Sequence, residues 1–187
     1  TLSSSSAASD VYKRQPTSYM LTLNNGASKT MGQYSTNINA TFNNPDYPSS
    51  VSVGFSSALK NDDDQLFNPI LKALNGTYST SIGDDGLIFS LSGVLANAKP
   101  QGSIKSLGIL SKSYSFAPRL RYPIKRSRDE SYYLEGGLNV ARSETFLLDS
   151  STTKDRLTVA DFVFSVTNDV WFGGSTQLNF TVAQGLD

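Results

Sequence analysis

Strict alternation of apolar and polar residues is the feature that most constrains this chain. In residues 156–171, RLTVADFVFSVTNDVW, the side chains of Ala160, Phe162 and Phe164 share one face. Asp161 and Ser165 share the other. Successive side chains of a β-strand point to opposite faces, so this period of two predicts a strand with one apolar and one polar face. The same pattern recurs in residues 34–42, 132–140 and 177–182.

Nine segments of this kind follow one another along the chain. The pattern predicts strands at residues 18–24, 33–43, 50–58, 74–82, 86–95, 111–122, 131–146, 156–171 and 175–183. The connections after the even strands are mostly short and include GDDG and FGG, which are typical of hairpin turns. The connections after the odd strands are mostly longer, including LLDSSTTKD before residue 156. Short turns at one end and long loops at the other indicate an antiparallel up-and-down sheet.

Strand length favours a membrane barrel over a soluble sandwich. Sandwich strands usually have about 5 to 6 residues, and several segments here are longer. Aromatic residues such as Tyr34 and Phe42 lie near the two ends of one apolar face, as in the aromatic girdles of outer-membrane barrels. We therefore predict an all-β, antiparallel up-and-down transmembrane β-barrel. A soluble or surface-bound β-sandwich that acts as a binding module is the alternative, since its core residues would give the same alternation.

Composition removes several classes of function. The chain has 16 basic and 16 acidic residues, and this balance argues against a nucleic-acid partner held by phosphate contacts. It has no Cys and no His, so it lacks disulfides and the commonest general base and metal ligand. We predict no catalytic, cofactor-binding or metal-binding residues, no cofactor and no enzymatic activity. An outer-membrane barrel with lipase or protease activity is a further alternative, but its catalytic site would have to lie in sequence outside this chain.

The N-terminal segment is predicted to lie outside the fold. SSAASDVYKRQ, residues 5–15, has one back-translation that resembles a transposase adapter used in preparing sequencing libraries. We expect residues 1–15 to be this artefact together with a disordered tail, and the gene to continue upstream. Residues 16–187 are then the N-terminal part of the barrel domain.

The order of features resembles one known family. The residues that carry the resemblance include LNGTYSTSIGDDGLIFSLSG, then RLRYPIKRSRDESYYLEGGLN, then DRLTVADFVFSVTNDVWFGGSTQLNFTVAQGL. Together with LNNGASKTMGQYSTNINATFNNP nearer the N-terminus, they resemble the barrel of the two-partner secretion transporters, the haemolysin-activator family of ShlB, FhaC and HecB type.

The resemblance implies a location and partners. It implies about the first nine strands of a sixteen-stranded barrel in the bacterial outer membrane, among membrane lipid and lipopolysaccharide. The implied function is export of a large unfolded partner of haemolysin or adhesin type, a secreted exoprotein, from the periplasm. The family's periplasmic domains and the second half of its barrel fall outside this chain. A general porin is the alternative function if the chain does not belong to an export channel.

Charged residues on the polar face are the candidate functional site. In a barrel, the alternation turns Arg119, Arg121, Glu135, Asp161 and Asp169 toward the lumen. There they would line a water-filled channel that a sliding polypeptide touches only weakly. In a sandwich, the same residues would face solvent.

Overall fold

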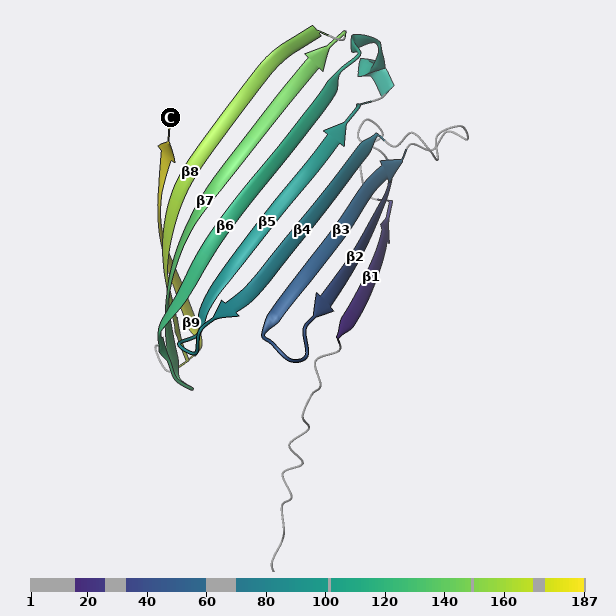
Figure 1. Cartoon of the computed structure of the whole chain (residues 1–187). Helices are drawn as coiled ribbons and strands as arrows, with labels where there is room; N and C mark the ends of the chain where they lie inside the picture. The colour runs from purple at the N-terminus through teal and green to yellow at the C-terminus, as the bar shows by residue number, and fades with distance from the viewer. Residues whose placement is uncertain are drawn as a thin grey trace, which may run out of the picture.

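One antiparallel sheet of nine strands makes up the fold. The structure is a computed structural model that describes residues 16–25, 33–59, 70–100, 102–148, 150–169 and 174–186. The strands lie side by side in chain order from β1 to β9, and every neighbouring pair is antiparallel. Figure 1 shows the strands tilted together and the sheet curling toward β9. This is the predicted all-β, up-and-down arrangement. The proposed artefact at residues 1–15 lies outside the described residues.

All nine predicted strands are present, and the central ones are longer than expected. β6, β7 and β8 have 17, 18 and 19 residues. A short 3-10 helix, Gly102–Leu107, lies between β5 and β6. The strands are β1 Thr17–Asn24, β2 Tyr34–Asn43, β3 Ser49–Leu59, β4 Leu71–Ile82, β5 Leu87–Ala98, β6 Leu110–Arg126, β7 Glu130–Leu147, β8 Ser150–Asn168 and β9 Thr176–Leu186.

The pairing register gives the sheet two chemically distinct faces. On the apolar face, Leu134 of β7 pairs with Phe164 of β8, which pairs with Phe180 of β9. On the opposite, polar face, Asn39 of β2 accepts a hydrogen bond from Ser52 of β3 at 2.9 Å. A shift of one residue would exchange the two faces of a strand, so the alternation itself fixes the register.

The apolar face is uncovered. The buried hydrophobic residues of the described chain are Ala58, Ile70 and Val166, too few for a soluble core. Phe162 is 50% exposed and Phe180 61% exposed. A sandwich buries such a face against a second sheet. The described residues form one sheet, so the sandwich alternative is wrong for this part of the chain.

Several strand ends differ from the prediction, and two of them differ by four residues or more. The strand predicted at residues 111–122 would end just before Pro123, but β6 continues to Arg126 across a register shift between Pro123 and Lys125. A bulge is one of the few places where a sheet tolerates proline, because the missing N–H is not needed there. We also expected a long loop around residues 147–155. Instead β7 reaches Leu147 and β8 begins at Ser150, because the Ser- and Thr-rich segment pairs with β7.

No helix in the described part of the chain is long and apolar enough to cross a membrane.

Candidate functional site

A charged cluster crosses the three longest strands on the polar face. Arg119 of β6 lies between Glu135 of β7 and Asp161 of β8, and we call these three residues the Arg119 cluster. Nη1 of Arg119 donates to Oε1 of Glu135 at 2.7 Å and to Oδ2 of Asp161 at 2.8 Å. Nη2 donates to Oδ1 of Asp161 at 3.0 Å. The planar guanidinium thus holds the Asp161 carboxylate through two parallel hydrogen bonds, the strongest geometry for this pair.

Gly137 makes this contact possible. In the register, Arg119 pairs with Gly137, and Gly137 pairs with Asp161, so β7 lies between the two charged residues. The side chain of Arg119 reaches across the space that a side chain at position 137 would fill. A Cβ atom there would lie 2.8 Å from Cγ of Arg119 and 3.3 Å from the carbonyl oxygen of Pro118. Glycine at this position serves close approach between strands rather than a turn.

The cluster is half sheltered from water. The side chains of Arg119, Glu135 and Asp161 are 32%, 27% and 11% exposed. One guanidinium serves two carboxylates, so the cluster carries a net charge of −1. Asp161 is the most sheltered member and receives the two-pronged bond. Since a sheltered charge is costly without a partner, Arg119 and Asp161 depend on each other.

The other two predicted site residues do not join the cluster. Arg121 lies on the same face, and its guanidinium stacks over the ring of Tyr133 at 4.1 Å. Asp169 follows the end of β8, where its backbone N–H donates to the carbonyl of Asp129 and its carboxylate accepts from Ser175 at 2.7 Å. Asp169 therefore belongs to the turn end of the sheet. The stacking of Arg121 on Tyr133 could not be predicted from the sequence, because it depends on the register between β6 and β7.

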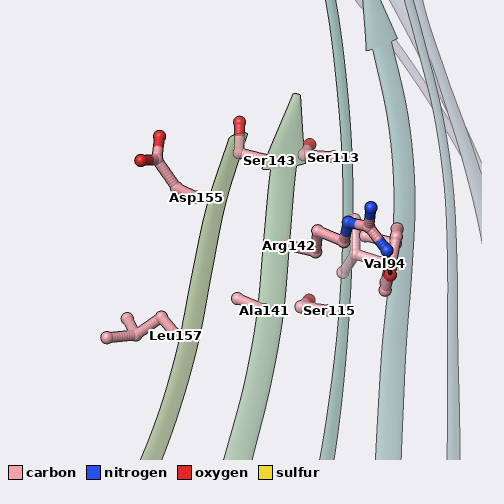
Figure 2. A pocket seen from close by; sticks show the side chains of 9 residues that line it. Val94, Ser113, Ser115, Ala141, Arg142, Ser143, Asp155 and Leu157 are labelled. Carbon is pink, nitrogen blue, oxygen red and sulfur yellow. Dashed lines mark hydrogen bonds between the residues drawn. The ribbon is translucent and has the colours of Figure 1, made fainter. Parts of the chain in front are cut away.

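A shallow hollow of about 270 Å³ lies farther along the polar face (Figure 2). Small side chains form much of it, because serine and alanine recur at polar-face positions of β6 and β7. Figure 2 shows Asp155 and Leu157 projecting to one side of the strands and Arg142 to the other. The polar-face residues that line it are Val94, Ser113, Ser115, Ala141, Ser143, Asp155 and Leu157.

The chemistry of this face is that of a hydrated surface. The carboxylates of the Arg119 cluster already accept strong hydrogen bonds from a guanidinium. Across the described ranges, no three potential ligands among His, Cys, Asp and Glu come close enough to hold a metal ion. The face presents fixed charge pairs and small hydroxyl groups.

Comparison with known proteins decides the family. The family profile described as haemolysin secretion/activation protein ShlB/FhaC/HecB matches residues 8–187. The chain belongs to this family. Its membership confirms the resemblance to this family drawn from the sequence.

A solved structure agrees with the fold of this ShlB/FhaC/HecB member. CdiB from Acinetobacter baumannii matches with a TM-score of 0.62 and 18% sequence identity. The match covers 92% of this chain and 33% of CdiB, so the chain spans about a third of that protein's length. The likeness is one of fold. No curated protein sequence matched the chain.

Proposed function

We propose that this chain forms the first part of the wall of an outer-membrane channel that exports a large, unfolded partner protein from the periplasm. The uncovered apolar face carries the proposal. Leu21, Phe55, Phe162 and Phe180 lie on it, each more than 40% exposed. Such a face is costly in water and stable against lipid. The polar face of the sheet then faces an aqueous lumen.

In this proposal the lumen-facing residues are Arg119, Arg121, Glu135, Asp161 and Asp169, with Asp169 at the turn end. An unfolded chain must slide past without being held. The Arg119 cluster suits that task because its guanidinium is already occupied by the wall's own carboxylates. Arg121 is likewise engaged by Tyr133. The small side chains of the hollow in Figure 2 offer few contacts that would hold the exported polypeptide.

The nine strands are proposed to continue into a sixteen-stranded barrel. Within the described residues, β1 and β9 form the two edges of the sheet. Lipid offers no hydrogen-bond partners to an open edge, so a membrane-embedded sheet must close on itself. Export of this kind requires no bond to be made or broken, and we propose no enzymatic step.

Deletion of the complete gene tests the export function. The secreted partner, of haemolysin or adhesin type, should then accumulate in the periplasm and disappear from the medium. Plasmid-borne transporter should restore secretion. Normal secretion of the partner in the deletion strain would contradict export, and free diffusion of small solutes through the purified protein would then favour a general porin.

A further inference from the structure

Basic residues gather at one end of the apolar face. A single cross-strand row runs through Lys72, Asn97, Lys112, Glu144 and Lys154, each paired with the next. The adjoining row pairs Tyr114 with Arg142 and Arg142 with Arg156. We call the five basic residues of these rows the cationic belt. They are Lys72, Lys112, Arg142, Lys154 and Arg156.

The belt carries more positive charge than its neighbours neutralise. Glu144 is the one acidic residue of the two rows, and it is held by Lys154 at 3.0 Å. Arg142 and Arg156 face each other directly across two strands. Like charges placed opposite one another destabilise a sheet unless an anion lies between them. The described hydrogen bond of Arg142 is a long one of 3.4 Å to the hydroxyl of Tyr114, and the carboxylate of Glu144, which also attracts Arg142, is already paired with Lys154.

The belt directly adjoins uncovered apolar surface. The next row of the same face contains Phe116, Val140 and Thr158. Phe116 is 50% exposed and Val140 39% exposed. A ligand that covers both surfaces must be an amphiphile, with an anionic head on the belt and apolar chains on the strands below it.

The opposite end of the apolar face differs. There, Lys125 and Glu130 form an ion pair, which Tyr132 joins through a hydrogen bond to Glu130 at 3.0 Å. In the described strands this pair supplies the only charges at the turn end of the face. Positive charge in excess is thus confined to the end with the longer connections, which is the cell-surface end of an outer-membrane barrel.

We propose that the cationic belt binds the phosphorylated headgroup of a glycolipid in the outer leaflet of the membrane. Arginine suits this role because its planar guanidinium binds phosphate oxygens in pairs. Arg142 and Arg156 form the centre of the site, with Lys72 and Lys112 at its side. The acyl chains lie along Phe116 and Val140. The inference rests on the proposed function in requiring an outer-membrane barrel whose apolar face meets lipid and whose longer connections face the cell surface.

The test uses the complete transporter, purified in nonionic detergent and titrated with bis-phosphorylated lipid A under native mass spectrometry. The double variant Arg142→Ser/Arg156→Ser should bind lipid A at least about tenfold more weakly. The matched control, Lys125→Ser/Glu130→Ser, removes the charged pair at the other end and should bind as the parent does. Heat-modifiable migration on gels checks that each variant is folded.

Two further arms identify the ligand chemistry. The double variant Arg142→Ser/Arg156→Ser is the belt variant. The affinity of the parent protein for dephosphorylated lipid A should be as low as the affinity of the belt variant for intact lipid A. Inorganic phosphate at millimolar concentration should not displace the lipid, since a free anion lacks the apolar chains. Equal lipid A affinity of the parent and the belt variant, or equal affinity for the dephosphorylated lipid, overturns the inference. Partner secretion is measured in parallel in the parent and the deletion strain. Binding of lipid A by the parent together with normal secretion from the deletion strain contradicts the proposed channel and leaves the lipid site intact.

Discussion

At the scale of single residues, Gly137 shows how one missing side chain assembles a site. The Arg119 guanidinium passes over its Cα to reach Asp161 two strands away. Glycine inside a strand normally weakens it, because the backbone loses more entropy and packs no side chain. Here the loss is offset by a two-pronged ion pair on a partly sheltered surface.

Gly137→Ala should destabilise the complete barrel by about 1 to 3 kcal/mol, because the new Cβ would overlap Arg119 and press on the Pro118 carbonyl. Urea unfolding of the protein in lipid vesicles measures this. Gly136→Ala is the matched control, since its Cβ would meet the nearest atom, of Phe162, at an ordinary 3.8 Å. Equal effects at the two positions would contradict the role assigned to Gly137.

Leu148 offers a second test at this scale. It occupies the tight β7–β8 connection with a φ of 48°, a left-handed conformation that disfavours residues with a Cβ. Leu148→Gly should stabilise the barrel by roughly 1 kcal/mol, because glycine adopts this φ without strain. Leu147→Gly, one residue earlier at the end of β7, should instead destabilise it. A lower urea midpoint for Leu148→Gly would refute this reading of the turn.

At the scale of elements, the sequence predicted the strands well and their ends poorly. The alternation identified all nine strands because period two follows directly from strand geometry. It placed Arg119, Arg121, Glu135 and Asp161 on one face for the same reason. It could not predict that Arg119 spans β7, because that contact depends on the register of three strands. The end at Pro123 was missed since a bulge is a tertiary feature with no period of its own.

Adjacent residues of β8 test the two faces. Phe164→Arg should destabilise the membrane-embedded barrel by about 2 to 4 kcal/mol if it lies near mid-membrane, because it turns a charge toward lipid. Val163→Arg, at the same depth but on the polar face, should cost far less, since it pairs with Glu135. Urea unfolding in vesicles compares the two. Equal destabilisation by both variants would contradict the assignment of the faces.

At the scale of the whole molecule, the fold is a curved wall rather than a globule. Nine strands in chain order expose one apolar face and carry the Arg119 cluster on the other. Family membership assigns this sheet to a protein of the ShlB/FhaC/HecB family. The central claim is that the polar face lines the path of the exported polypeptide.

Cysteine labelling of the complete transporter in cells tests that claim most directly, and residues 1–187 contribute no cysteine of their own to the background. Single cysteines replace residues 162–165 in turn and meet a water-soluble maleimide. We predict labelling at positions 163 and 165, little at 162 and 164, and protection of 163 and 165 when a partner fused to a stably folded domain stalls in the channel. Labelling without alternation, or reactivity at 163 and 165 unchanged by the stalled partner, would contradict the account.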